Sequence, residues 1–191
     1  MANQMKKIKD WKRILIDTTA LCSLFRSEKS GNKNSHDHFV RKLITYLVGS
    51  KTSNNEERTL LVSSVTVAEL ITNEEDSEKI KRIMRILDSK SVEFVDFDVE
   101  IALSFNAQLK HLLNKPSLHK IASEIGFETN NYAMAREWIS KDFMIIMCAQ
   151  GANADIILTA DKNTFYPVAK EIENCNCVLT YEELFDQSDS Y

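Results

Sequence analysis

Short apolar runs alternate with longer amphipathic stretches along this chain, and that alternation constrains the fold more than any other feature. The runs predict strands at 13–17, 59–64, 92–97, 155–160 and near 177–180. Helices are predicted between them, at 19–26, 36–48, 65–71, 76–88, 98–113 and 142–151. Strands separated by helices favour βαβ units, in which helices cover both faces of a parallel sheet. The expected fold class is therefore α/β, a three-layer α/β/α sandwich with a central, mainly parallel sheet.

Two apolar segments near the C-terminal end support this fold class. The run "DIILTA" (155–160) is almost continuously apolar, which is typical of a parallel strand buried on both faces. The preceding stretch "DFMIIMCAQG" (142–151) predicts a helix that is covered on both sides. Only 4 Gly and 2 Pro occur, which argues against a loop-rich all-β fold, and 191 residues suit a single domain spanning 1–191.

Composition and the first residues predict a cytoplasmic protein. No apolar run has the length needed to span a bilayer, and no apolar segment precedes Asp10 that could act as a secretory signal. Cys22 and Cys148 lie in apolar stretches and are expected to be buried thiols. A net charge of −4 gives no overall basic footprint for coating DNA. It leaves open an enzyme whose carboxylates hold cations against a phosphate backbone.

Four carboxylates are expected at one edge of the predicted sheet. Asp17 ends the first strand, Asp161 follows the fourth, and Glu69 lies in the helix that leaves the second. Asp142 is expected to open the helix that leads down to the fourth strand, so that the helix N-terminus lies at the same edge. In an open α/β sheet the ligand site lies beyond the carboxyl ends of the strands, which is this edge.

Other acidic residues test this prediction from strand position. Asp155 begins a strand and should lie at the opposite end of the sheet. Asp96, Asp98 and Glu100 also follow a strand, but they are typical of a helix N-cap with first-turn acids. Each of the four candidates also has an ordinary explanation as a cap, a turn residue or a solvated helix residue. Their convergence favours a site, because like charges raise one another's pKa and hard cations such as Mg²⁺ or Mn²⁺ remove that conflict.

Four separated motifs resemble those of a PIN domain, in the same order and at similar spacing. They are "ILIDTTAL" (14–21), "VSSVTVAEL" (62–70), "DFMIIMCAQ" (142–150) and "ADIILTADKNTF" (154–165). The chain resembles the PIN-like ribonucleases, especially the toxins of bacterial type II toxin–antitoxin pairs. The match covers most of the chain.

The resemblance implies a metal-dependent endoribonuclease acting on single-stranded or structured RNA. It implies that the catalytic and metal-binding residues are Asp17, Glu69, Asp142 and Asp161, with Thr18, Thr159 and Asn163 in support. The cofactor would be one or two Mg²⁺ or Mn²⁺ ions that activate water for in-line attack, leaving a 5′-phosphate and a 3′-hydroxyl. Arg136, Lys141, Lys162 and Lys120 are weaker candidates for lining the RNA path. An antitoxin partner and a homodimer are also consistent with the family.

Departures from the family keep other interpretations open. The chain is longer than the compact toxins, with extra length near 27–57 and 114–140 that we interpret as insertions. A non-catalytic PIN-like RNA-binding or protein-interaction module is the main alternative. A phosphatase built around an aspartate nucleophile is disfavoured, because the second Asp it needs two positions after the first is Thr19 here.

Overall fold

A computed structural model gives the structure and describes residues 7–26, 36–72, 75–113, 120, 123 and 132–180. Its centre is a five-stranded sheet in the order β3-β2-β1-β4-β5, in which each neighbouring pair is parallel. The strands are β1 (Arg13–Ile16), β2 (Thr59–Ser63), β3 (Val92–Val95), β4 (Ile156–Thr159) and β5 (Cys177–Leu179). The predicted parallel sheet is therefore confirmed.

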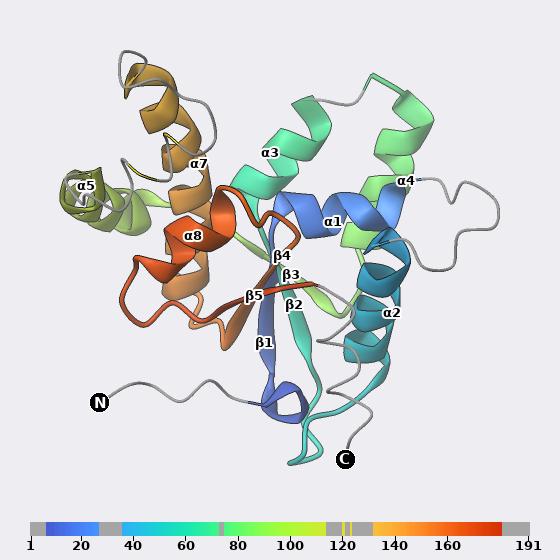
Figure 1. Cartoon of the computed structure of the whole chain (residues 1–191). Helices are drawn as coiled ribbons and strands as arrows, with labels where there is room; N and C mark the ends of the chain where they lie inside the picture. The colour runs from blue at the N-terminus through green and yellow to red at the C-terminus, as the bar shows by residue number, and fades with distance from the viewer. Residues whose placement is uncertain are drawn as a thin grey trace.

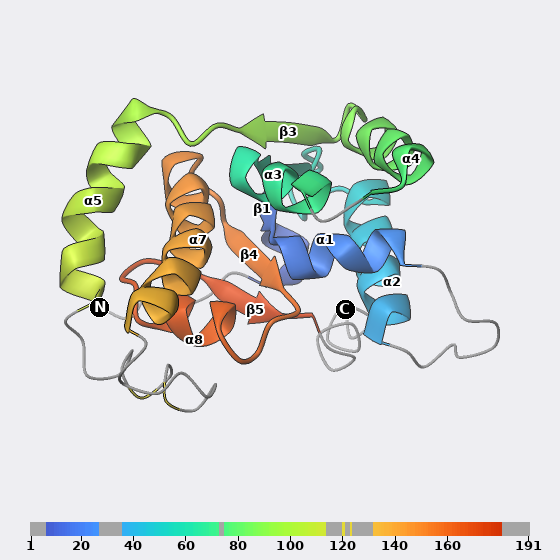
Figure 2. The same cartoon turned by 90° about the horizontal axis from the view of Figure 1, so that it is seen from above.

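Helices connect the strands and cover the sheet (Figure 1). They are η1 (Ile8–Asp10), α1 (Thr18–Phe25), α2 (His36–Gly49), α3 (Ser64–Thr72), α4 (Ser77–Leu87), α5 (Val99–Leu113), α7 (Tyr132–Gly151) and α8 (Phe165–Lys170). Seen from above, α5, α7 and α8 lie on one side of the sheet and α1, α2 and α4 on the other (Figure 2). This is the expected three-layer arrangement.

The alternation of side chains along β1 divides the interior into two cores. Ile14 and Ile16 belong to the core under α1, α2 and α4, whereas Leu15 belongs to the core under α5, α7 and α8. Successive side chains of a strand point to opposite faces, so a strand covered on both faces needs apolar residues at every position. The burial of all four residues of β4 follows the same rule.

The strand order reverses between β1 and β4. After β1 the chain builds β2 and β3 on one side, and it then crosses to the other side to build β4 and β5. A crevice forms outside the carboxyl ends of the strands at such a switch point, where ligands bind in open α/β sheets. Any residue directly after β1 or β4 is therefore placed at this switch point.

The structure corrects two features of the predicted elements. α7 begins at Tyr132, ten residues before the predicted start, and α8 lies in a stretch where no helix was predicted. Residues 27–35 of the first predicted insertion and most of 114–131 in the second lie outside the described residues. The single domain and its two insertions therefore stay predictions.

No helix in the described ranges is long and apolar enough to cross a membrane.

Candidate functional site at the switch point

Asp17 and Asp161 flank the switch point. Asp17 follows β1 directly, and its backbone N–H extends the ladder to the carbonyl oxygen of Leu158 at 3.0 Å. Asp161 follows β4 after one intervening residue. The register that pairs Ile16 with Leu158 sets Asp17 beside Thr159. The sheet backbone thus fixes these two carboxylates at adjacent strand ends.

Asp17 is a buried N-cap held by three donors. The residue is 1% exposed, and its Oδ1 accepts a hydrogen bond of 2.8 Å from the Ala20 backbone N–H. The hydroxyls of Thr19 and Thr159 each donate to Oδ2 at 2.7 Å. These bonds lower the pKa, but burial outweighs them and the Asp161 charge adds to it, so that the pKa of Asp17 is raised to about 6.

Glu69 joins the site from α3. Its Oε2 accepts a hydrogen bond from the hydroxyl of Thr18, the residue after Asp17. This contact links the start of α1 to the middle of α3 across a separation of 51 residues. The predicted supporting role of Thr18 therefore has a structural counterpart, because its hydroxyl orients the Glu69 carboxylate.

Asp161 is held by the turn that leads into α8. Its Oδ1 accepts from the backbone N–H groups of Asn163 at 2.8 Å and Thr164 at 3.0 Å. Its Oδ2 accepts from the Thr164 hydroxyl. The Asp161 N–H in turn donates to the hydroxyl of Thr159 at 3.0 Å. The contribution of Asn163 comes from its backbone, and its side chain is exposed.

Asp142 lies inside α7, so the expectation that it opens the helix was wrong. It nevertheless lies at the height of the site. The helix rises about 14 Å from Asp142 to its end at Gly151, and β4 then runs back about 13 Å in the opposite direction. Asp142 is therefore level with the carboxyl end of β4. The part of α7 before Asp142 continues past the sheet edge (Figure 1). The helix that carries Asp142 therefore begins earlier than predicted, and the role of Asp142 stays a prediction.

The four carboxylates are electrostatically coupled. The pKa of Asp142 is raised well above its usual range, first by burial and then by the charges of Asp161, Asp17 and Glu69. A hydrogen bond with Thr164 opposes the shift. Each of the other three candidates thus lies near enough to Asp142 to disfavour its ionisation. The four side chains share one electrostatic environment.

In the described ranges, no three Asp, Glu, His or Cys side chains are close enough to ligate one ion as they stand. Threonine hydroxyls hold three of the four carboxylates instead, as described above for Asp17, Glu69 and Asp161. The donor set still fits a hard cation, because it consists of carboxylate and hydroxyl oxygens. A cation would also relieve the repulsion that raises the pKa of Asp142.

Two acidic positions outside the site behave as predicted. Asp155 lies at the amino end of β4, where its Oδ2 accepts from the backbone N–H groups of Lys12 at 2.8 Å and Arg13 at 2.9 Å. Asp98 caps α5, since its Oδ1 accepts from the Ile101 N–H at 2.9 Å. Neither acid is among the charges that raise the pKa of Asp142, which separates them from the candidate carboxylates.

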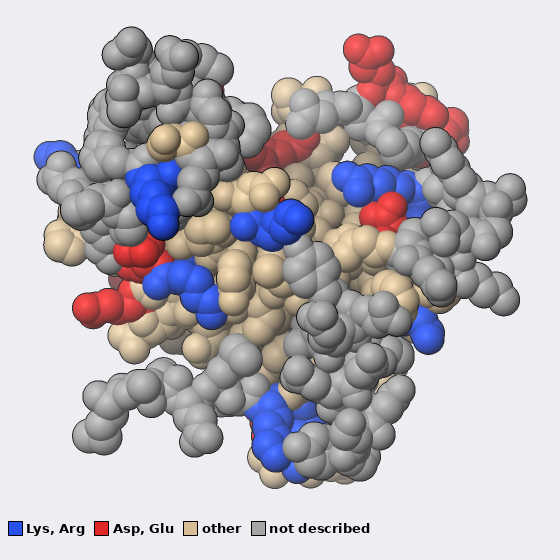
Figure 3. Space-filling model, in the orientation of Figure 1, with Lys and Arg blue, Asp and Glu red and all other residues tan. Residues whose placement is uncertain are grey.

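The predicted RNA-contacting cations are less defined. Lys141 lies in α7 next to Asp142, and Lys162 follows Asp161. Both are exposed, as is Lys120. Arg136 falls within α7, but its side chain lies outside the described part of the structure. Figure 3 shows Lys and Arg side chains in separate patches over the side that carries α7 and α8.

Two site residues were missed by the sequence analysis. Thr19 donates to Asp17 and accepts from the Ala160 N–H at 3.0 Å, and Thr164 connects Asp161 with Asp142. Thr164 stands three residues after Asp161, and Thr19 two residues after Asp17. Hydroxyls at these short offsets were the available signal, because Ser and Thr side chains commonly bond to nearby groups in turns and caps.

The cysteines lie outside this site and are all free thiols. Cys148 is buried as predicted, whereas Cys22 is half-buried. Burial raises the pKa of Cys148 to about 12 and raises that of Cys177 further. These thiols therefore stay protonated near neutral pH and are poor nucleophiles.

Comparisons with known proteins bear on the fold. No protein-family model matches the sequence, and no curated protein is significantly similar to it. Among solved structures, the chain is similar to VapBC2 from Rickettsia felis bound to a fragment of promoter DNA, at 16% identity and TM-score 0.49, over 87% of this chain and 98% of that one. It is similar to DNA-bound VapBC from Salmonella typhimurium at 15% identity and TM-score 0.48, over 88% and 98%. It is similar to VapBC-1 from nontypeable Haemophilus influenzae at 14% identity and TM-score 0.51, over 88% and 98%.

These likenesses concern the fold. The match to the Haemophilus influenzae structure covers nearly the whole of that chain, with a TM-score of 0.51. Together with the all-parallel five-stranded sheet, it confirms the expected three-layer α/β/α fold of PIN type. At 14% identity it carries no assignment of activity or of individual site residues.

Proposed function

We propose that this protein is a metal-dependent endoribonuclease that hydrolyses phosphodiester bonds in single-stranded or structured RNA. The observation that carries the proposal is the gathering of Asp17, Glu69, Asp142 and Asp161 at the switch point of the sheet. Burial and the charges of the other three carboxylates raise the pKa of Asp142, which supports their proximity. Four mutually repelling carboxylates at the switch point of a parallel sheet form an arrangement that divalent cations neutralise. The PIN-type fold supports the same activity.

The four carboxylates would hold Mg²⁺ or Mn²⁺, in part through water. Such an ion supplies Lewis-acid stabilisation to a phosphoryl oxygen and lowers the pKa of a bound water. The chain's own hydroxyls do the positioning. Thr19 and Thr159 hold Asp17, Thr18 holds Glu69, and Thr164 holds Asp161. Lys141, Lys162 and Arg136 are proposed to contact the RNA backbone.

A role as the toxin of a toxin–antitoxin pair in the cytoplasm is a narrower form of this proposal. It rests on the resemblance of the four motifs to PIN-like toxins. The antitoxin would be a small protein encoded beside this chain, and co-expression of the two should abolish RNA cleavage. A homodimer, proposed on the same resemblance, is testable by light scattering.

A non-catalytic RNA-binding or interaction module is the second candidate. One observation favours it: among the described residues, no three acids are gathered at ligation distance. The two candidates differ in their response to metal. A nuclease site should bind Mn²⁺ as its carboxylates leave their threonine partners, whereas a scaffold should neither bind Mn²⁺ nor be stabilised by it.

The decisive experiment is cleavage of a mixed, end-labelled RNA pool with Mg²⁺ or Mn²⁺. Wild type is compared with Asp17→Asn and with Asp98→Asn. Asp98 is an acid at the same sheet edge whose helix-capping role asparagine retains. We expect metal-dependent cleavage by wild type and Asp98→Asn, with products carrying a 5′-phosphate, and its loss in Asp17→Asn.

Two outcomes would contradict the proposal. Equal cleavage by wild type and Asp17→Asn would place the active site elsewhere. Absence of cleavage with both metals, together with no Mn²⁺ binding by calorimetry, would favour the non-catalytic module.

A further inference from the structure

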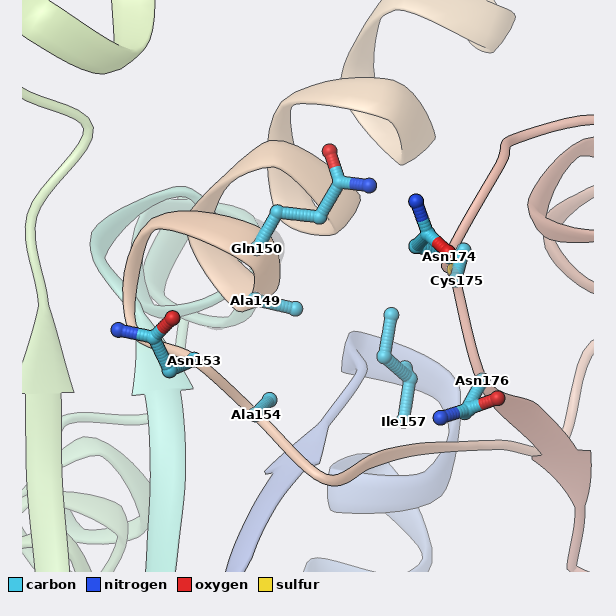
Figure 4. A pocket seen from close by; sticks show the side chains of 8 residues that line it. All are labelled: Ala149, Gln150, Asn153, Ala154, Ile157, Asn174, Cys175 and Asn176. Carbon is cyan, nitrogen blue, oxygen red and sulfur yellow. The ribbon is translucent and has the colours of Figure 1, made fainter. Parts of the chain in front are cut away.

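A pocket lies at the opposite end of the sheet from the carboxylates. It has a volume of about 260 Å³ and opens between the end of α7 and the segment that leads into β5 (Figure 4). Its polar wall consists of carboxamides from Gln150, Asn174 and Asn176, and Ala149 and Ile157 give it an apolar floor. The proposed nuclease function makes no use of this pocket.

Two backbone contacts orient the amides. The Gln150 Nε2 donates to the carbonyl oxygen of Glu173 at 3.1 Å, and the Asn176 Nδ2 donates to that of Asp155 at 3.3 Å. Each carboxamide has a second N–H and a carbonyl oxygen beyond that bond. In Figure 4 the side chains of Gln150 and Asn174 point toward each other across the opening. The wall therefore presents donors and acceptors side by side.

The lining favours an uncharged ligand. None of the eight described residues that line the pocket is Lys, Arg, His, Asp or Glu. Burial raises the pKa of the Cys175 thiol to about 12, so this residue is also neutral. A flat ligand with apolar faces and a polar edge matches an apolar floor and an amide wall. Nucleobases have this character, and Asn and Gln side chains pair with their edges.

The short helix α8 connects the pocket with the candidate active site. It begins just after the Asp161 turn and ends at Lys170, about 9 Å further on. The Lys170 ammonium lies 4.9 Å from the centroid of the Tyr166 ring, and its charge lowers the pKa of Cys175 in the pocket lining. An aromatic ring and a cation along one path are typical of single-stranded nucleic-acid binding.

We propose that this carboxamide-lined pocket binds an unpaired nucleobase of the RNA, with Tyr166 and Lys170 guiding the strand from the carboxylates to the pocket. Gln150, Asn174 and Asn176 would read the edge of the base, while Ile157 contacts its face. The pocket would thereby contribute to the choice of cleavage site. The assignment of the base to an RNA strand rests on the proposed ribonuclease function, whereas the binding of a base to the pocket does not.

The test is a metal-free titration of ¹⁵N-labelled protein with AMP, GMP, CMP and UMP, monitored through side-chain amide signals. Ribose 5-phosphate is the probe for binding by the phosphate alone. Asn174→Gly removes one amide without backbone strain, because Asn174 has φ of 57°. Asn55→Gly is the matched control, since Asn55 also has a positive φ, of 62°, and lies between α2 and β2, outside the pocket lining.

We expect at least one mononucleotide to shift the Gln150 and Asn176 signals while ribose 5-phosphate leaves them unchanged. Asn174→Gly should weaken binding about three- to ten-fold, the effect of one hydrogen bond, and Asn55→Gly should bind as wild type. In RNA cleavage, Asn174→Gly should raise KM and leave kcat unchanged.

The proposal is overturned if no mononucleotide moves these signals, if ribose 5-phosphate moves them equally, or if both Asn variants weaken binding alike. Failure of the pocket is separable from failure of the proposed function. Base binding without RNA cleavage would refute the ribonuclease alone, and metal-dependent cleavage without base binding would refute the pocket alone.

Discussion

At the scale of single residues, burial and hydrogen bonding oppose each other at Asp17. Three hydrogen bonds favour the ionised carboxylate, but taking it out of water costs more, and its pKa is raised to about 6. Asp142 has fewer compensating hydrogen bonds, and three like charges repel its ionised form. Both carboxylates therefore destabilise the metal-free fold, yet both are suited to holding a cation. This trade-off between stability and function is typical of functional sites.

Asp142→Asn should stabilise the metal-free protein. Asparagine keeps the shape of the side chain and removes a buried charge that Asp161, Asp17 and Glu69 repel. We expect the free energy of unfolding at pH 7.5 to rise by about 1–3 kcal/mol, measured by urea denaturation in EDTA. The same variant should lose the stabilisation that Mn²⁺ gives wild type. A metal-free variant less stable than wild type would show that the repulsion is insignificant.

Thr159 is one of the three hydrogen-bond donors that lower the pKa of Asp17. Its fully buried hydroxyl donates to Asp17 Oδ2 at 2.7 Å and accepts from the Asp161 N–H at 3.0 Å. Thr159→Val removes both bonds at nearly constant volume. We expect the acid limb of the RNA-cleavage pH profile to move up by about 0.5–1 pH unit, because the Asp17 pKa rises. The expected loss of stability is about 1–3 kcal/mol.

Thr159→Ser is the control, since serine retains the hydroxyl. Its pH profile should stay close to that of wild type, although the lost methyl group lowers its stability. A profile shifted equally in the Ser and Val variants would mean that packing, and not the hydrogen bond, controls Asp17.

At the scale of elements, Arg58 joins the first segment of the chain to the loop before β2. Its guanidinium donates from Nη1 to the carbonyl oxygens of Ile8 at 2.8 Å and Trp11 at 2.6 Å, and from Nη2 to those of Lys9 at 3.3 Å and Lys51 at 3.1 Å. The side chain is 5% exposed. Arg58→Met should lower the free energy of unfolding by about 2–4 kcal/mol, measured by urea denaturation.

A surface ion pair in the same region provides the comparison. Lys12 Nζ lies 2.6 Å from Glu56 Oε1, with both side chains about half exposed. Lys12→Met should change stability by less than about 0.5 kcal/mol. Similar losses in the Lys12 and Arg58 variants would show that the buried hydrogen bonds of Arg58 contribute no more than a solvated ion pair.

The strands were predictable to within about two residues. For β1, β2 and β4 the reason is that parallel strands buried on both faces require uninterrupted apolar runs. The helices that frame the site were less accessible. The apolar run at 142–151 concealed the true start of α7 at Tyr132, because Arg136, Glu137, Ser140 and Lys141 interrupt the apolar residues before it. α8 has six residues, which is fewer than two turns and too short for an amphipathic pattern to be recognised. It also includes Pro167, which is tolerated in a first turn.

The four acids could be predicted from the sequence because strand ends locate Asp17 and Asp161, and the preceding or following helix locates the other two. The hydroxyls of Thr19 and Thr164 could not be singled out. Their roles depend on contacts with Ala160 and Asp142, which the tertiary structure creates. The amide pocket was missed for the same reason, since its walls come from α7 and from the segment before β5.

At the scale of the whole molecule, the site links stability to pH. The pKa of Asp17 is about 6 in the folded protein and 3.8 without the fold, so the folded state retains the proton more strongly. Its contribution to stability is therefore complete below about pH 3.8 and is lost as pH rises through 6. The difference corresponds to about 3 kcal/mol, and Asp142 acts in the same direction.

A bound divalent cation should reverse this trend, because metal ligands must be deprotonated. We expect Asp17 to lower the thermal stability of the metal-free protein between pH 4.5 and pH 7.5. Asp17→Asn is the control for the contributions of other titrating groups. The gain in Tm on adding Mn²⁺ should be near zero at pH 4.5 and should grow through pH 6, because saturating metal stabilises only the form that binds it. Scanning calorimetry at several pH values, with and without Mn²⁺, measures both trends. A gain in Tm that is independent of pH, or equal in wild type and Asp17→Asn, would mean that the ion binds away from these carboxylates.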